Sequence, residues 1–461
     1  MRKLILLLAL GLPAFAAFNS TMQLDVRTTG ADTNSGGFDP GVVSPGTDES
    51  QQNTGTAMTV VASGTTAVST PAFSATTHGP GNTLIVTGGS GCNTGTFEEL
   101  SQSGGTATFD SSLGTGTCTA VMGGSKITNA AALALVVSGN TLNTQAGTYT
   151  VTSTLVTPSV SQFLWIGYQT THADGGTKPL ITTATNSVDL IDAGTSSGGV
   201  VAFDNLSLSN TAVTPANGIV KTSNNGEGVV RNCKLSGFTD GINGDNQGSH
   251  YYFPFLHVSA TEIAASTTTG IVNEASVYVE AGSYIHGSGA SYGIRTTSTN
   301  AATIVVSKSV IDSNNYCIVS VFDIVLTDSV VSNCAIVGAQ NVNGQTIFSA
   351  TGTIFYNDAI GAENTTSGNF NVGAYANNAY GSNTTNTANL YIPASASAND
   401  VNLSSCNPFV SSSNFALSAC GLAALAGKGY PGTAPFGAGS ATIGPVQAAS
   451  STAGNSSAYV Q

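Results

Sequence analysis

Four short segments in the second half of the chain share one pattern. They read Ser283-Tyr-Ile-His286, Ser309-Val-Ile-Asp312, Ser329-Val-Val-Ser332 and Thr353-Ile-Phe-Tyr356, and Cys233-Lys-Leu-Ser236 precedes them. The third residue is always apolar. Because side chains alternate between the two faces of a strand, the third residue faces a core and the fourth faces outward. The pattern predicts a repeated short strand with the core column Leu235, Ile285, Ile311, Val331 and Phe355.

A second mark recurs between these segments, a small residue followed by Ile. The interval from one mark to the next runs from 18 residues (Cys317 to Ala335) to 29 residues (Gly241 to Gly270). A third strand-like run, such as Ile304-Val-Val306, completes each repeat. The marks are Gly218-Ile219, Gly241-Ile242, Gly270-Ile271, Gly293-Ile294, Cys317-Ile318, Ala335-Ile336 and Ala359-Ile360.

Repeats of about 23 residues with three short strands cannot bury their own apolar faces. Stacking places each strand on its copy, at ~4.8 Å, and closes one continuous core. A propeller blade needs about 40 residues, and no helices lie between the strands as a TIM barrel requires. We therefore predict an all-β fold, a single-stranded parallel β-helix, with a small N-terminal β module and a C-terminal cap.

These marks resemble the coils of right-handed parallel β-helix proteins of the pectate-lyase-like superfamily. Ala146-Gly-Thr-Tyr-Thr-Val151 and Phe163-Leu-Trp-Ile-Gly-Tyr168 are similar to the first coils of that group. The stretches 26–38 and 429–447 look like the ends of secreted or phage-tail-like members. The resemblance implies right-handed winding and covers most of residues 24–447. It does not fix an activity, because the scaffold carries lyases, hydrolases, tail spikes and adhesins. The motifs of the polysaccharide-cleaving members, a G-H-G and an R-x-K element, are missing here.

Composition excludes several classes of function. Charged residues make up 8% of 461 residues, against about 25% in ordinary domains. With 11 Lys and Arg and a net charge of -13, the chain is poorly suited to neutralise phosphates, so no nucleic acid is expected as a partner. No apolar run reaches the ~18 residues of a membrane span.

The N-terminus has the features of a secretory signal peptide. Arg2 and Lys3 precede the apolar run Leu4–Leu12, and Ala14-Phe-Ala16 forms a cleavage site. We expect a protein that is secreted or held at the cell surface. The expected domains are a signal peptide (1–16), an N-terminal arm and β module (17–135), the β-helix (136–390), a C-terminal cap (391–430) and a low-complexity tail (431–461).

Seven cysteines fit this oxidising location. Their spacing favours three local pairs, although connectivity does not follow from sequence alone. The pairs would be Cys92 with Cys118, Cys317 with Cys334, and Cys406 with Cys420. Cys233 is left over and lies in the inward frame of its strand, which predicts a buried free thiol.

The outward column of the repeated strand offers the main candidate catalytic residues. It runs Ser236, His286, Asp312, Ser332 and Tyr356, so His286 and Asp312 are expected on neighbouring coils. A carboxylate beside an imidazole is a way to build a general acid/base, and Arg295 from the same coil would bind an anionic sugar. The alternative is an exposed ladder without catalysis.

Three further features have structural alternatives. Lys308 above Asp328 at the preceding turn is expected to be a solvent-screened ion pair. Asp32-Thr-Asn-Ser-Gly-Gly37 partly resembles a calcium loop, yet Gly36 and Val43 stand where the loop needs ligands, so we expect a turn and no cofactor. The aromatic run 251–255, between His250 and His257, fits either sugar contact or loop packing.

The function expected from the sequence is recognition of extracellular polysaccharide or a cell-surface glycan. The sequence leaves open whether the protein also cleaves its polymer as a lyase or hydrolase. The alternative is a non-catalytic adhesive or receptor-binding protein, for which a trimer of parallel solenoids would be one assembly.

Overall fold

The structure is a computed structural model that describes most of the chain between residues 23 and 425. The described ranges are 23–37, 58–70, 82–194, 198–222, 225–245, 252–264, 266–287, 291–297, 302–343, 347–365, 371–390, 392, 397, 400–403, 406–411 and 414–425. The predicted signal peptide and the low-complexity tail lie outside these residues. The fold is all-β, with 54% strand and 4% helix, and forms a parallel β-solenoid of about nine turns. The predicted fold class is therefore confirmed.

The chain divides into two compact units. The first comprises the described residues up to Gln145 together with Val160–Asp174, and the second comprises Ala146–Ser159 and the described residues from Gly175 onward. The sequence-based domain boundaries are not tested by this division and stay predictions.

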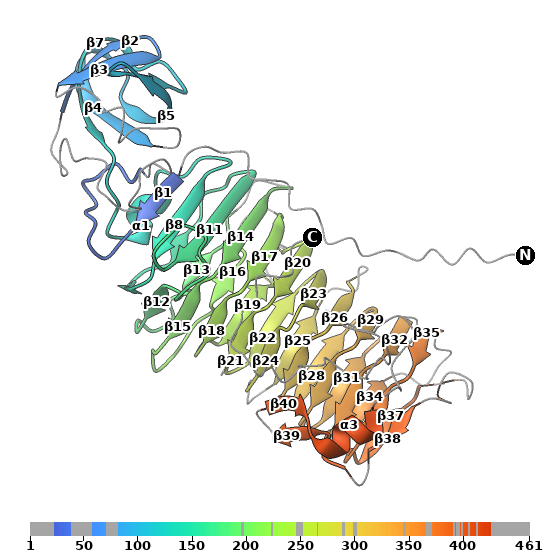
Figure 1. The fold of residues 1–461 in the computed structure, drawn as a ribbon. Coiled ribbons are helices and arrows are strands. Elements are labelled where there is room, and N and C mark those ends of the chain that lie inside the picture. The colour runs from blue at the N-terminus through green and yellow to red at the C-terminus, as the bar shows by residue number, and fades with distance from the viewer. Residues whose placement is uncertain are drawn as a thin grey trace, which may run out of the picture. The chain divides into compact units, whose positions relative to one another are not determined.

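The first unit contains a closed antiparallel barrel and a short parallel ladder (Figure 1). The disulfide Cys92–Cys118 links two neighbouring barrel strands. The barrel consists of β2 (Met58–Ser63), β3 (Thr66–Thr70), β4 (Thr83–Cys92), β5 (Gly95–Ser103), β6 (Thr106–Phe109) and β7 (Gly114–Met122). The ladder consists of β1 (Gln23–Val26), β8 (Thr141–Gln145) and β11 (Gln162–Tyr168), with the helix α1 (Asn129–Leu133) beside it.

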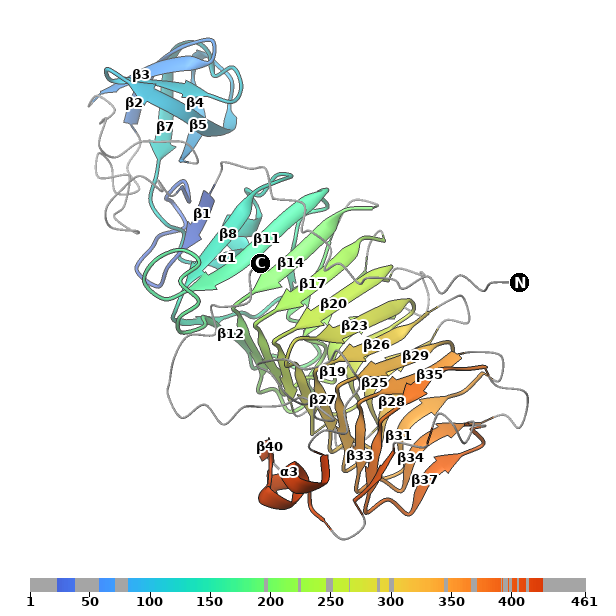
Figure 2. The same ribbon diagram turned by 45° about the vertical axis from the view of Figure 1, so that its right-hand side comes forward.

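The second unit is built from three parallel sheets, which the chain visits in turn in each coil (Figure 2). Sheet 1 contains β14 (Val200–Asp204), β17 (Glu227–Arg231), β20 (Phe255–Ser259), β23 (Ser276–Glu280), β26 (Ile304–Ser307), β29 (Ile324–Thr327), β32 (Ile347–Thr351) and β35 (Asn371–Ala376). Sheet 2 contains β9 (Thr148–Thr150), β12 (Leu180–Thr183), β15 (Ser207–Asn210), β18 (Lys234–Ser236), β21 (Glu262–Ala264), β24 (Tyr284–His286), β27 (Val310–Asp312), β30 (Val330–Ser332), β33 (Ile354–Tyr356), β36 (Ala379–Gly381) and β38 (Val401–Asn402). Sheet 3 contains β10 (Leu155–Val156), β13 (Ile191–Asp192), β16 (Ile219–Val220), β19 (Asp240–Gly244), β22 (Thr269–Asn273), β25 (Tyr292–Thr296), β28 (Tyr316–Ser320), β31 (Val337–Asn341), β34 (Ile360–Asn364) and β37 (Thr385–Ala388).

The core column predicted from the repeated segments is confirmed in sheet 2. Ile285 pairs with Ile311, and Ile311 with Val331. All three side chains are fully buried, as are Leu235 and Phe355. One member was missed: Ile263 of β21 lies between Leu235 and Ile285.

The small-residue mark has a physical cause in sheet 3. A side chain at Gly241 would meet the carbonyl oxygen of Gly270 at 2.6 Å, because successive coils approach closely there. The last two predicted marks were misplaced, the first by three residues and the second by two. Ile336 is 41% exposed, and the core position in that coil belongs to Ala339, preceded by Gly338.

The predicted disulfides are all present, Cys92–Cys118, Cys317–Cys334 and Cys406–Cys420. Cys233 is a buried free thiol. Burial raises its pKa to about 12, which keeps it protonated and unreactive. Three disulfides are typical of proteins in oxidising locations outside the cytosol.

The C-terminal cap comprises β39 (Phe409–Ser411), β40 (Asn414–Leu417) and α3 (Ala419–Leu425), which lie beside the stacked strands (Figures 1 and 2). Their apolar residues pack on an outward column of sheet 2. That column contains Val310, Val330, Ile354 and Ala379, and the cap contributes Phe409, Phe415 and Leu425. None of the described helices is long and apolar enough to span a bilayer.

Candidate functional site

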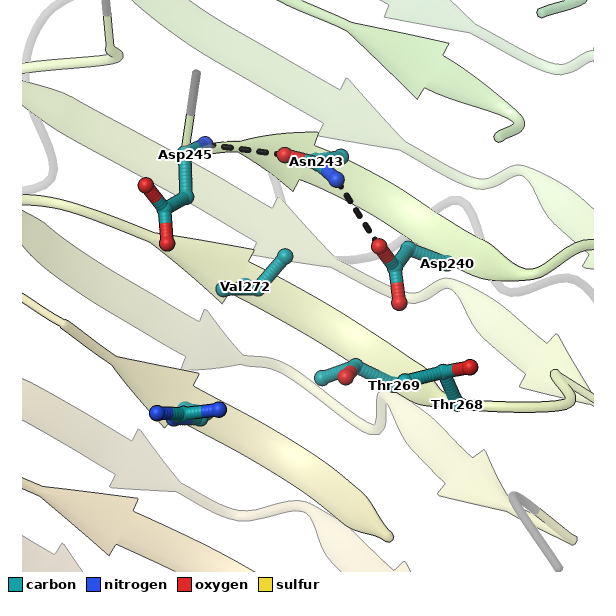
Figure 3. A pocket seen from close by; sticks show the side chains of 7 residues that line it. Asp240, Asn243, Asp245, Thr268, Thr269 and Val272 are labelled. Carbon is teal, nitrogen blue, oxygen red and sulfur yellow. Dashed lines mark hydrogen bonds between the residues drawn. The ribbon is translucent and has the colours of Figure 1, made fainter. Parts of the chain in front are cut away.

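A pocket lies on the outer face of sheet 3 (Figure 3). Its lining residues come from three consecutive coils, the strands β19, β22 and β25 and the residues beside them. They are Asp240, Asn243, Asp245, Thr268, Thr269, Val272 and Arg295. Two carboxylates, an amide, two hydroxyl groups and a guanidinium thus meet around one apolar side chain.

Strand register explains how these side chains share a face. Ile242, Ile271 and Ile294 pair in one inward column. The next residue of each strand faces outward, which gives the column Asn243, Val272 and Arg295. Asp240 pairs with Thr269 at the start of the same strands. Short strands stacked in register therefore concentrate residues that are 55 positions apart in the sequence.

Asn243 connects the two carboxylate residues of the pocket. Its side-chain amide donates to Asp240 Oδ2 at 2.8 Å, and its Oδ1 accepts the Asp245 backbone N–H at 2.9 Å. Figure 3 shows Asp240 and Asp245 on either side of Asn243.

Asp240 is a buried carboxyl group whose pKa lies above its ordinary value. Its side chain is 8% exposed, and Oδ1 has no hydrogen-bond partner among the described residues. Burial raises the pKa of Asp240, while hydrogen bonds from Thr269 and Asn243 partly oppose the shift. A raised carboxyl pKa is the property that a general acid needs near neutral pH.

Arg295 lies in this pocket, and this placement differs from the one expected. It was expected to bind an anionic sugar at the same site as His286, since both belong to one coil. The structure places Arg295 on β25 of sheet 3 and His286 on β24 of sheet 2. Arg295 contacts the Tyr292 ring, 4.8 Å from its centroid.

His286 and Asp312 do pair in register on neighbouring coils. The imidazole, however, lies against another carboxylate, with His286 Nε2 3.3 Å from Glu262 Oε1. Asp312 was expected to face solvent but is 2% exposed. Its oxygens accept hydrogen bonds from Ser332 and Ser313, each at 2.7 Å, and from Asn333 at 2.6 Å. The acid/base role of His286 and Asp312 stays a hypothesis.

Glu262 was missed although its segment, Thr261-Glu-Ile-Ala264, has a hydroxyl residue first and an apolar residue third, as the repeated segments have. It also binds Lys234 at 3.0 Å. Burial raises the pKa of Glu262, but hydrogen bonds from Lys234 and His286 outweigh burial and hold the pKa below its ordinary value. The three side chains form a partly exposed charge ladder on sheet 2.

A second polar cluster lies in the first unit and was also missed. Asp25 is 1% exposed and accepts a hydrogen bond from the Tyr168 hydroxyl at 2.6 Å. His172 Nε2 lies 3.3 Å from Asp25, and Arg27 forms an ion pair with it. Burial raises the pKa of Asp25, but the hydrogen bonds and charges of these partners outweigh burial and hold the pKa below its ordinary value. The carboxylate therefore stays charged. The cluster ties the segment after β11 to β1.

The remaining candidates have structural roles or lie partly outside the described residues. Asp32 accepts the N–H groups of Ile127 and Thr128 and so supports the start of α1. Phe253 is buried near the Lys221 ammonium group, whereas Tyr251 and His250 are not among the described residues.

Lys308 and Asp328 occupy successive turns, both with positive φ. Burial raises the pKa of Asp328 to about 6, and the Lys308 charge opposes that rise. In the part of the chain that the structure covers, no three His, Cys, Asp or Glu side chains are grouped to hold a metal ion.

No family model matches the chain, and no curated protein matches it. Among solved structures, it resembles the catalytic domain of a GH87 alpha-1,3-glucanase variant in complex with tetrasaccharides. The two are 10% identical, the match covers 80% of this chain and 89% of that chain, and the TM-score is 0.29.

Proposed function

We propose that this protein is an exported β-helix that recognises extracellular polysaccharide through the sheet 3 pocket. The observation that supports this most is the convergence of Asp240, Asp245 and Arg295 with hydroxyl and amide groups on one open sheet face. A sugar presents hydroxyl groups in several directions, and a pocket that both donates and accepts hydrogen bonds suits it.

The direction in which the strands of sheet 3 stack suits an extended polymer. Successive strands of sheet 3 lie ~4.8 Å apart, so an extended chain that follows the stack would meet a new set of side chains at each coil. Beyond Arg295 the outward column continues with Val319, Gln340 and Glu363, and the last two are joined by a hydrogen bond of 2.7 Å. These residues would extend the contact with a long ligand.

Binding of the full-length protein to a panel of neutral and acidic polysaccharides tests the proposal. Arg295→Ala and Asp240→Asn should weaken binding at least 10-fold. Lys234→Ala is the matched control, since it removes an exposed cation from sheet 2. Equal binding by all four proteins, or no binding by the wild type, would rule the proposal out.

The same samples decide whether the polymer is cleaved. Release of reducing ends would indicate hydrolysis, and release of unsaturated ends would indicate a lyase. A fall in turnover in Asp240→Asn would assign acid catalysis to that carboxyl group. Binding without either product would favour the adhesive alternative.

A further inference from the structure

Arg295 differs from the other two described arginines. Arg27 pairs with Asp25, and Arg231 pairs with Asp204. Among the described residues, the Arg295 guanidinium has no hydrogen bond or ion pair to the protein, and its one recorded contact is with the ring of Tyr292. Arg295 is half-buried in the pocket. Its N–H groups therefore have no protein acceptor.

Tyr292 is held in place from the neighbouring coil. It pairs with Tyr316 of β28, and the two rings stack with centroids 5.4 Å apart and planes 27° apart. A cation over an aromatic face is attracted electrostatically. The stacked rings therefore provide a fixed surface for the guanidinium, which lowers the entropy lost when Arg295 binds a ligand.

We propose that Tyr292 is a positioning residue that presents Arg295 to an oxyanion, a carboxylate or a sulfate group, on the bound glycan. This inference rests on the proposed function and names the class of saccharide. The planar guanidinium matches such a group with two parallel hydrogen bonds.

Two carboxyl groups, those of Asp240 and Asp245, line the same pocket and would repel an anionic ligand when charged. Asp240 is buried, and burial raises its pKa above the ordinary value. The N–H groups of Arg295, in contrast, are left without an anionic protein partner in a chain of net charge -13. An anionic ligand would supply the partner that this half-buried cation lacks among the described residues.

The test is calorimetric titration of the full-length protein with three tetrasaccharides: a neutral glucan, a uronic acid oligomer and a sulfated glucan. Short ligands limit repulsion by the net charge of the protein. At least one acidic ligand should bind more tightly than the neutral one. Arg295→Gln should raise its Kd about 10-fold or more. Which acidic ligand responds identifies the carboxylate or the sulfate.

The positioning role has its own variants. Tyr292→Leu should raise the acidic Kd about 2- to 5-fold, the size of an exposed cation–π contact, and leave the neutral Kd unchanged. Tyr292→Phe should retain wild-type binding, because the ring and not the hydroxyl group carries the contact. Lys234→Ala again serves as the control, and thermal unfolding checks that each variant is folded.

The outcomes separate the two proposals. Equal affinity for the three ligands, or unchanged acidic binding in Tyr292→Leu, would overturn this inference and leave polysaccharide recognition standing. A wild-type protein that binds neither these ligands nor any polysaccharide of the panel would overturn both.

Discussion

Sheets 2 and 3 belong to the same solenoid but have different outer faces. In sheet 2 the outward residues Val310, Val330 and Ile354 are apolar and lie under the C-terminal cap. In sheet 3 the outward residues Asn243 and Arg295 are polar and line an open pocket. Both faces are built by the same stacking, so stacking alone does not decide which face is available to a ligand.

The difference shows how one scaffold can carry a covered apolar face and an exposed polar face. Apolar outward columns attract a covering segment because burial of apolar surface is favourable. Polar columns stay hydrated and can exchange water for a ligand. In the charge ladder of sheet 2, Lys234 and Glu262 occupy the same register position as Val310 on earlier coils, and His286 contacts Glu262.

The largest expected effect comes from the core that both faces share. Ile311→Asp places a charge in a fully buried column without a partner. We expect no soluble protein. Ile311→Val, the matched control, should fold with a loss of about 1 kcal/mol. Soluble Ile311→Asp protein with the wild-type thermal midpoint would contradict the assigned register.

The next effect concerns the covered face alone. Phe415 is 6% exposed and contacts Tyr284 and Phe409. Phe415→Ala should cost about 3 kcal/mol in the free energy of unfolding and accelerate hydrogen exchange in α3. Val410→Ala is the control, because Val410 of β39 is 59% exposed. Glycan binding on sheet 3 should not change; a parallel loss would show that the two faces depend on each other.

A pH-dependent effect on stability is expected at the turn that joins sheet 2 to sheet 3. Asp358 is 2% exposed, and burial raises its pKa well above the ordinary value. The carboxyl group of Asp358 makes its full contribution to stability at pH values below its unfolded-state pKa of 3.8. This contribution is lost as the pH rises through the raised pKa of the folded state. Asp358→Asn should therefore raise the thermal midpoint at pH 7 and have little effect at pH 3.

The comparison of the two pH values is the control for this variant. Asn keeps the acceptor for the Cys334 N–H, which Asp358 Oδ1 now binds at 2.9 Å. Equal shifts of the midpoint at both pH values would mean that the proton on Asp358 is not the cause.

The smallest expected effect is that of His286→Ala. The imidazole is partly exposed and its contact with Glu262 is worth less than about 1 kcal/mol. We expect the thermal midpoint and glycan binding to stay near the wild-type values. A fall in polysaccharide turnover of about 10²-fold in this variant would instead support the acid/base hypothesis for His286, and would place the chemistry on sheet 2.

The repeated short strands made much of the fold predictable. The column from Leu235 to Phe355 follows from alternation, and alternation needs no knowledge of distant contacts. The pattern of a small residue followed by Ile placed Ile336 in the core, but Ala339 fills the core position of that coil. A small residue such as Ala gives only a weak hydrophobic signal in the sequence. The coil of Ile263 could have been found, since Thr261-Glu-Ile-Ala264 has the hydroxyl residue first and the apolar residue third.

The sequence by itself determined the coil architecture and the inward frame of Cys233, and its spacing favoured the three cysteine pairs that the structure contains. Only the tertiary structure decided which polar residues meet. Arg295 and His286 are nine positions apart yet lie on different sheets, whereas Arg295 and Asp240 line one pocket. The physical reason is that the chain turns between each strand and the next, so consecutive strands belong to different sheets. Proximity along the chain therefore does not place side chains on one face, and stacking between coils does.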